Sequence, residues 1–320
     1  MPIRIQRSEH NPIVHPDMDD RILGNINGPS LMRVPEWIEN PLGRYYLYFA
    51  HHQGQFIRLA YAHDFLGPYT VYSPGVLDID ETLFTRHIAS PDAHIDHDAQ
   101  KIRIFYHGNG FTGPKPEDIG QNTCYAESSD GLNFVMDGVC LGISYMRIFQ
   151  WDGWYYGFGG GGDRYLWRTQ NHRELFERGP QLTIEGEDYT RISSITPENK
   201  KEPDYSIYRM RHPALHLRGH ELDIYYSNVG DTPERIKRTT VDLRKDWTKW
   251  VGSPPQEILG TETDYEGLDL PIEPSSGGSS HVRVHQVRDP YLYTENDRTY
   301  LVYSVAGESG LSIVELIEDA

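Results

Sequence analysis

Five ionisable side chains are crowded into seven positions of the chain near residue 92. The stretch reads "SPDAHIDHD" and contains Asp92, His94, Asp96, His97 and Asp98. Carboxylates and imidazoles at this density can bind a divalent cation, or they can transfer protons to and from a substrate. Whether the five act together depends on the strand or turn that each of them occupies.

The composition limits the kinds of protein that this chain can be. It has 320 residues, 38% hydrophobic and 24% charged, which is enough for a sizeable core. No apolar run reaches the roughly 18 residues of a membrane span, and the N-terminus lacks the apolar centre of a signal peptide. We therefore expect a cytoplasmic protein, unless a leader has been removed. The two cysteines, Cys124 and Cys140, form no CxxC pair and favour free thiols over a zinc module.

The chain is strongly acidic, with a net charge of −17 and a pI near 5.3. Such a charge repels nucleic acid and anionic membranes, so we expect neither as a partner. Most of the 30 cationic residues are Arg, which binds carboxylate, sulfate or phosphate through two parallel hydrogen bonds. A local anion pocket is therefore compatible with the acidic chain. The sequence indicates no oligomeric state.

A repeated unit runs through the whole chain. Short Tyr-, Ile- and Val-rich runs separated by Gly, Pro and Asp predict an all-β protein, and they recur as five copies of a four-stranded unit. This pattern predicts one five-bladed β-propeller domain over residues 1–320. The fifth copy lacks its outermost strand, which residues 3–7 can supply; a disordered N-terminal arm is the alternative. The expected blades are residues 27–77, 90–141, 145–182, 211–259 and 288–317.

The long connections indicate which face of the propeller is functional. Strands of a blade run outward from the axis, so successive connections alternate between two faces. Residues 78–90, 107–121, 183–211 and 260–288 all fall on one face, whereas the other face has tight turns. Because loops above about 12 residues usually serve a function, we expect the site on the long-loop face.

Alignment of the second and fifth copies divides the crowded stretch. Asp96, His97 and Asp98 align with the turn at residues 295–297, so we expect them to be solvated. Asp92 and His94 lie on the innermost strand and share one side of it by the two-residue alternation. We expect these two side chains to face the axial pocket.

The same reasoning brings polar residues of all five copies to the axis. As a set they favour a polar small-molecule site in which the side chains perturb one another's pKa values, although a structural hydrogen bond explains any single one about as well. The catalytic candidates are Asp92, Asp289, Glu308, His94 and His212. The substrate-binding candidates are Asn27, His51, His52, His107, Tyr145, Arg147, Asp163, Arg211 and Arg288.

The repeat resembles the five-bladed propeller glycoside hydrolases, with family 43 as the nearest comparison. "ASPD" at residues 89–92 is similar to the Trp-Ala-Pro-Asp/Glu segment that starts the family's second blade. "GRYYLYFA" and "NDRTYLVYS" are similar to its second strands, and "AHDFLGPYTVY" to its Gly-Pro-Trp passage. The resemblance implies a glycoside hydrolase for a plant or algal poly- or oligosaccharide, acting on chain ends or on short oligosaccharides.

The catalytic carboxylates of family 43 are not matched. Where the resemblance implies an Asp base, a second Asp and a Glu acid, this chain has Gly28, Tyr145 and Arg211. Hydrolysis needs one group that protonates the leaving oxygen and one that activates water. The pair would therefore be relocated to the catalytic candidates above, with a histidine as a possible acid.

Three arginines and a metal ion are further expectations near the axis. Arg147, Arg211 and Arg288 would orient the sugar or an anionic substituent; ion pairs with Asp92 and Asp289 are the alternative. No cofactor is required for hydrolysis. The resemblance allows a structural calcium ion near the axis, but no metal-ligand spacing in the sequence is diagnostic.

Two other functions fit the same sequence. A polysaccharide lyase would use Tyr145 with His94 or His212 as base and acid, and an Arg to neutralise a uronate carboxylate. A non-catalytic carbohydrate-binding propeller would explain the missing carboxylates as lost chemistry. A carbohydrate is the expected partner in all three cases.

Overall fold

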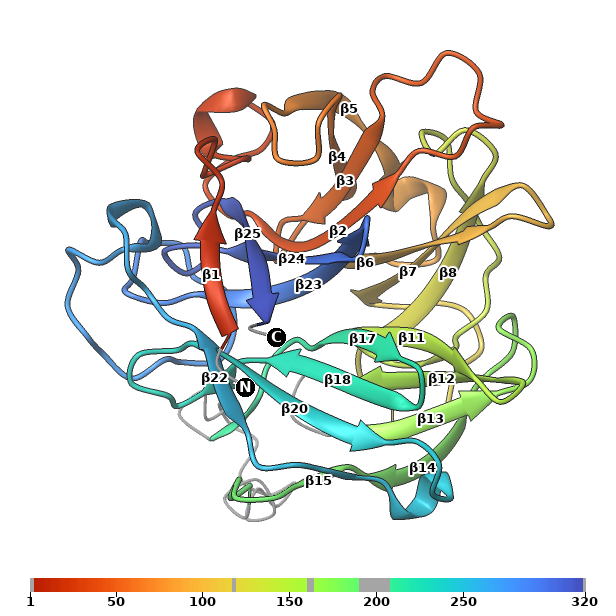
Figure 1. The fold of residues 1–320 in the computed structure, drawn as a ribbon. Helices are drawn as coiled ribbons and strands as arrows, with labels where there is room; N and C mark the ends of the chain where they lie inside the picture. Colours follow the sequence, from red (N-terminus) through yellow and green to blue (C-terminus); the bar gives the residue numbers. More distant parts are fainter. Residues whose placement is uncertain (1–2, 117–118, 160–163, 190–207, 319–320) are drawn as a thin grey trace.

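Five small antiparallel sheets surround a central axis, so the chain folds as a five-bladed β-propeller (Figure 1). The structure is a computed structural model, and it describes residues 3–116, 119–159, 164–189 and 208–318. The predictions of an all-β class and of five four-stranded blades are confirmed. Within the described residues, no helix is both long and apolar enough to cross a membrane.

Each blade is built from consecutive strands, in the order that the repeats predict. Blade 1 contains β2 (Asn27–Arg33), β3 (Tyr45–Ala50), β4 (Phe56–Ala62) and β5 (Thr70–Asp78). Blade 2 contains β6 (His87–Asp96), β7 (Lys101–Asn109) and β8 (Asn122–Ser128). The short strands β9 (Val135–Met136) and β10 (Gly142–Ile143) both pair with β8. Blade 3 contains β11 (Met146–Trp151), β12 (Trp154–Gly159), β13 (Tyr165–Thr169) and β14 (Glu177–Gln181).

The fourth blade has additional strands, and the fifth takes one strand from the N-terminus. Blade 4 contains β17 (Ala214–Arg218), β18 (Glu221–Tyr226) and β20 (Ile236–Asp242), with β21 (Val251–Gly252) and β22 (Gln256–Leu259) paired to β20 and β15 (Thr183–Ile184) paired to β21. Blade 5 contains β23 (Arg288–Glu295), β24 (Arg298–Ser304), β25 (Leu311–Glu318) and β1 (Ile3–Arg7). A separate two-stranded sheet joins β16 (Arg209–Met210) to β19 (Asn228–Val229). Short 3₁₀ helices include η1 (Pro16–Met18), η2 (Ile79–Glu81), η5 (Trp247–Lys249) and η6 (Asp264–Glu266).

The two ends of the chain close the ring. β1 pairs antiparallel with β25, with Ile3 opposite Glu318 and Arg7 opposite Val314 (Figure 1). This strand is the outermost strand of blade 5, as the sequence predicts. Arg7 also donates from Nε to Oε1 of the fully buried Glu266 at 3.1 Å. The N-terminal strand therefore ties the first blade to the last.

A separate hydrophobic cluster fills each of the five interfaces between neighbouring blades. The two-residue alternation of a strand sends adjacent side chains to different interfaces. Leu31, for example, packs toward blade 5, whereas Met32 packs toward blade 2. Blade strands are thus buried on both faces, and this packing holds the innermost strands in a fixed arrangement around the axis.

A repeated backbone irregularity begins the innermost strand of four blades. Gly28, Ser90, Tyr145 and Asp289 adopt a left-handed conformation with φ between 51° and 58°, and the pairing register shifts beside three of them. A bulge of this kind re-aims the side chain of the extra residue. In blade 1 the space is narrow, because a Cβ atom on Gly28 would lie 2.9 Å from Cα of Ser90. The four positions therefore form a ring around one end of the axis.

Candidate active site

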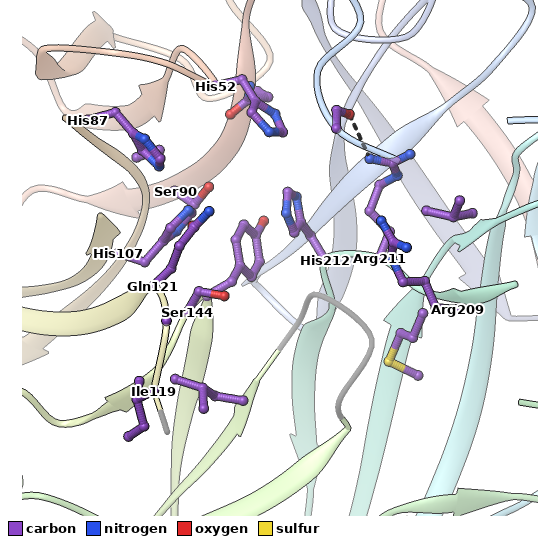
Figure 2. A pocket seen from close by; sticks show the side chains of 18 residues that line it. His52, His87, Ser90, His107, Ile119, Gln121, Ser144, Arg209, Arg211 and His212 are labelled. Carbon is purple, nitrogen blue, oxygen red and sulfur yellow. Dashed lines mark hydrogen bonds between the residues drawn. The ribbon is translucent and has the colours of Figure 1, made fainter. Parts of the chain in front are cut away.

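A pocket of about 410 Å³ lies where the innermost strands of blades 1 to 4 begin (Figure 2). Its volume is within the range of small-molecule sites. Among the described lining residues none is Asp or Glu, although the chain as a whole is acidic. The polar lining residues are Asn27, His52, His87, Ser90, His107, Gln121, Ser144, Tyr145, Arg209, Arg211 and His212.

His212 forms a dyad with a buried carboxylate at the base of the pocket. Its Nδ1 lies 2.6 Å from Oδ1 of Asp289, and its ring stacks on Tyr145 at 3.6 Å between centroids and 7° between planes. Burial lowers the pKa of His212 although Asp289 opposes this effect. Burial alone would raise the pKa of Asp289, but its contact with His212 lowers it below the usual value. A neutral imidazole that donates from Nδ1 to an ionised carboxylate leaves a basic Nε2.

His52 faces this dyad from the loop after β3 and has its own carboxylate. Its Nδ1 lies 3.5 Å from Oε2 of Glu308, which is fully buried, and its ring centroid lies 6.5 Å from that of His212 (Figure 2). Burial alone would raise the pKa of Glu308, whereas His52 and Arg288 lower it well below its usual value. Two carboxylate-backed imidazoles therefore face each other across the pocket.

Arg211 and Arg288 are held by buried carboxylates, which neutralise their charges. Arg211 donates from Nε to Oε1 of Glu234 at 2.7 Å, and its other nitrogens donate to the carbonyl groups of Ser276 and Gly278. Arg288 pairs with Glu234 at 3.3 Å and with Glu308 at 3.2 Å. The expected ion pairs of these two arginines are thus present, but with glutamates instead of Asp289.

Arg147 lies below the pocket and joins several blades. It donates to the carbonyl oxygens of Pro91 at 2.6 Å and Pro213 at 3.2 Å, to that of Pro29 at 3.4 Å, and to the hydroxyl of Tyr145 at 3.1 Å. Asp92 lies 3.3 Å away and balances its charge. Its residue exposure is 2%, so we assign Arg147 to the interior and not to substrate binding.

Blade 2 forms one wall of the pocket. His107 on β7 is 8% exposed, and its Nδ1 has no hydrogen-bond partner among the described residues. The ring of His87 on β6 lies 5.9 Å from it, between centroids, and Ser90 and Gln121 lie beside these rings (Figure 2). Burial lowers the pKa of His107 well below its usual value and also lowers that of His87. This wall has hydrogen-bonding capacity that none of the described residues uses.

The predicted residues fall into three groups. Those that line the pocket are Asn27, His52, His107, Tyr145, Arg211 and His212. Those buried beneath it are Asp92, Arg147, Arg288, Asp289 and Glu308. Outside the pocket lining are His51 and His94, and Asp163 lies outside the described residues.

The crowded stretch near residue 92 does not converge on the axial pocket. His94 contacts Oδ2 of Asp92 through Nε2 at 3.0 Å, but it lines a different hollow, together with the next four residues. His97 and Asp98 are exposed in the turn, as expected. Asp96 is only half-exposed because it pairs with Arg103. Asp92 accepts from the backbone N–H of residue 148 at 2.9 Å, which is a structural role.

Sequence reasoning did not single out several pocket residues. Ser90 and Ser144 begin innermost strands, so the alignment of the copies with Asn27 could have found them. His87 and Gln121 lie in or beside the long connections of blade 2. A position in a long connection indicates the functional face but does not single out a residue. Glu234 carried no signal, because its importance depends on two arginines that are distant in the sequence. The missed residues are His87, Ser90, Gln121, Ser144, Arg209 and Glu234.

The axial residues do not fit a calcium ion. Calcium takes six to eight oxygen ligands, whereas the carboxylates here are engaged by arginine and histidine. Within the described ranges, no group of three or more His, Cys, Asp and Glu side chains is arranged to hold a metal ion. No step of the chemistry below depends on a metal.

The chain is similar in sequence to a viral protein. No family model matches the chain. It is 35% identical over 308 residues to an uncharacterized protein of Acanthamoeba polyphaga mimivirus, and the match covers 90% of this chain and 82% of that protein.

Solved structures show the same architecture at low sequence identity. The GH43_1 enzyme from Xanthomonas citri has a TM-score of 0.59 at 15% identity, over 92% of this chain and 88% of that one. A GH43 beta-xylosidase/alpha-arabinofuranosidase from a compost microbial metagenome, in complex with xylotriose, has a TM-score of 0.61 at 15% identity, over 92% of each chain. An exo-1,5-alpha-L-arabinanase from a bovine ruminal metagenomic library has a TM-score of 0.57 at 11% identity, over 91% and 92%. The expected likeness to family 43 is therefore confirmed for the fold.

Proposed function

We propose that this chain, which belongs to the same protein family as the uncharacterized mimivirus protein, is a glycoside hydrolase that cleaves its substrate in the axial pocket. The observation that carries the proposal is the His212–Asp289 dyad, with a 2.6 Å contact and a ring fixed on Tyr145. The fold adds support, because structures of this architecture include enzymes in complex with xylose and xylotriose. In this proposal two histidines replace the two carboxylates of the usual glycosidase.

His212 is the general base. Its Nδ1–H donates to the ionised Asp289, so the lone pair on Nε2 is available to take a proton from water. Stacking on Tyr145 fixes the plane of the ring, and Arg147 fixes the Tyr145 hydroxyl in turn. The base is therefore oriented before substrate binds, which is the arrangement that efficient proton transfer requires.

His52 is the general acid. In its imidazolium form Nδ1 faces the carboxylate of Glu308, and Nε2–H can protonate the leaving glycosidic oxygen. The ring centroids of His52 and His212 lie 6.5 Å apart. In inverting glycosidases the two catalytic carboxyl groups are about 6.5–9.5 Å apart, which leaves space for the attacking water. We therefore propose inversion at the anomeric carbon.

The shape of the pocket favours short substrates. Its volume of about 410 Å³ is near the low end of the range for ligand sites. We propose that the enzyme removes terminal sugars or cleaves short oligosaccharides.

Variants of the dyad test the proposal. His212→Gln and Asp289→Asn should each lower turnover of a cleaved oligosaccharide by about 10²- to 10⁴-fold, because proton transfer contributes factors of this size. His97→Gln on the exposed turn is the matched control and should leave turnover unchanged. Unchanged turnover in both dyad variants would contradict the proposal.

The product identifies the reaction. Neutral, sulfated and uronate-containing oligosaccharides are assayed for new reducing ends and for ultraviolet absorbance. A hydrolase gives reducing ends without absorbance, a lyase gives both, and a binding protein gives neither. The second or third result would replace the proposed function with one of its rivals.

A further inference from the structure

The wall of the axial pocket formed by blade 2 has a chemistry that differs from the rest of the protein. It consists of His87, Ser90, His107 and Gln121, and we call it the histidine wall. The chain has 47 acidic and 30 basic residues, yet no acidic side chain is among the described residues that line the pocket. Sites for neutral sugars commonly use carboxylates that accept from hydroxyl groups. Such acceptors are missing from this wall.

One imidazole of the wall is buried with unused hydrogen-bonding capacity. His107 is 8% exposed, and Nδ1 has no partner among the described residues. Buried polar atoms without a partner are rare in native proteins, and a ligand is one of the explanations for them. Figure 2 shows that His107 lies beside Ser90 and Gln121 in the pocket. The ring is therefore placed to meet a bound molecule.

The neighbours of His107 and its burial disfavour its protonated form. The charged or titratable groups around it are His87 on β6, Arg147 on β11, Tyr145 just before β11, His212 at the start of blade 4 and His52 from blade 1. These groups are cationic or neutral, and burial lowers its pKa further. An anionic group beside the ring would favour the protonated form, with both nitrogens as donors.

We propose that the histidine wall binds an oxyanion substituent of the sugar, a carboxylate or a sulfate, and that His107 takes up a proton when it does so. This inference rests on the proposed function for the location of the sugar. It assigns the anion to the histidines, since the charges of Arg147 and Arg211 are already paired with the buried carboxylates of Asp92 and Glu234. The substrate is then an acidic sugar.

Matched ligands test the assignment. D-glucuronate is D-xylose with an added carboxylate, and galactose 6-sulfate is galactose with an added sulfate, so each pair isolates the anionic group. Kd is measured by calorimetry for all four sugars between pH 5.5 and 8. We expect at least one anionic sugar to bind tenfold or more tightly than its neutral partner at pH 6. Above the pKa of the free His107, uptake of one proton makes Kd rise about tenfold per pH unit.

Variants of His107 separate charge from shape. His107→Asn keeps a neutral polar group near Nδ1, so it should retain part of the binding but lose the pH dependence. His107→Phe should remove the preference for the anionic sugar, and thermal melting checks that both variants fold. Equal Kd values within each ligand pair, or a preference that survives in His107→Phe, would overturn the inference.

The outcomes for the two proposals are distinguishable. Cleavage of neutral oligosaccharides, with equal binding of the matched ligands, would leave the hydrolase proposal standing and overturn the anion site. Selective binding of an anionic sugar, without turnover of any oligosaccharide, would support the anion site and overturn the hydrolase proposal.

Discussion

Two regions on the same axis use polar residues in opposite ways. The axial core lies beneath the pocket. We define it as Arg147, Asp92 and the prolyl carbonyl groups that Arg147 contacts. Arg147 donates there to three carbonyls and a tyrosine hydroxyl. In the histidine wall, by contrast, Nδ1 of His107 has no partner among the described residues. Arg147 and His107 are both buried, and both regions contain cationic or titratable side chains. Unused hydrogen-bonding capacity, more than charge, distinguishes the candidate site from its support.

The difference has a physical reason. A buried guanidinium without partners is costly, so Arg147 is tolerated because backbone oxygens from several blades surround it. An imidazole is neutral when buried, and one unpartnered nitrogen costs much less. A protein can therefore leave a histidine partly unsatisfied for a ligand, whereas an arginine at the same depth has to be satisfied by the protein.

Removal of Arg147 should have the largest effect on stability. Arg147→Met removes the arginine that pairs with the buried Asp92. It also removes the hydrogen bonds that join three blades, so we expect the free energy of unfolding to fall by about 3–5 kcal/mol. The double variant Arg147→Met with Asp92→Asn should recover part of this loss. Urea denaturation measures both, and a loss below about 1 kcal/mol for the single variant would show that the axial core is not a structural unit.

A methyl group at the bulge of blade 1 should have an intermediate effect. Gly28 has φ of 58°, and a Cβ atom there would lie 2.9 Å from Cα of Ser90. Gly28→Ala should therefore cost about 1–3 kcal/mol from backbone strain, with a further cost from the contact. Gly153→Ala is the matched control, since Gly153 has φ of 75° and nothing within 4 Å. Equal losses of unfolding free energy in the two variants would show that the close approach of Ser90 is not what requires a glycine at position 28.

Acid should destabilise the pocket in two stages. Burial lowers the folded-state pKa of His107 and His212, so the unfolded chain binds more protons and stability falls as the pH drops below about 6.5. The pKa values of Asp289 and Glu308 are also lowered, so their stabilisation is complete above about pH 4 and is lost below it. Urea denaturation from pH 7.5 to 3.5 measures both stages. A free energy of unfolding that increases from pH 7 to pH 5.5 would contradict the first stage. His107→Phe should make the loss of stability in this first stage smaller.

Substitutions in the exposed turn of blade 2 should have the smallest effect. His97 and Asp98 are exposed and lie outside the axial pocket. We expect Asp98→Asn to change the free energy of unfolding by no more than about 0.5 kcal/mol and to leave turnover unchanged. A larger change in turnover would show that the hollow beside His94 takes part in function.

The repeat made most of the fold predictable. Alternating apolar residues, Pro at strand starts and Gly or Asp in turns are local signals, so the five blades and the closing strand at residues 3–7 could be inferred without contacts between distant segments. The same alignment placed Asn27 and His212 at the pocket as the starts of innermost strands, and it placed His107 there from the connection between the second and third strands. It misplaced His94, because alternation gives the side of a strand but not the depth along the axis at which the pocket ends.

The sequence by itself determined the blade, the strand and the side of the strand for each candidate residue, since these follow from a period of two and from turn residues close in the chain. The tertiary structure decided which buried charges are neutralised and which remain for a ligand. Glu234 is paired with Arg211 and Arg288, and Asp289 is left to His212. Such pairings depend on distances of a few ångströms between blades, and electrostatic and hydrogen-bond energies change steeply over that range.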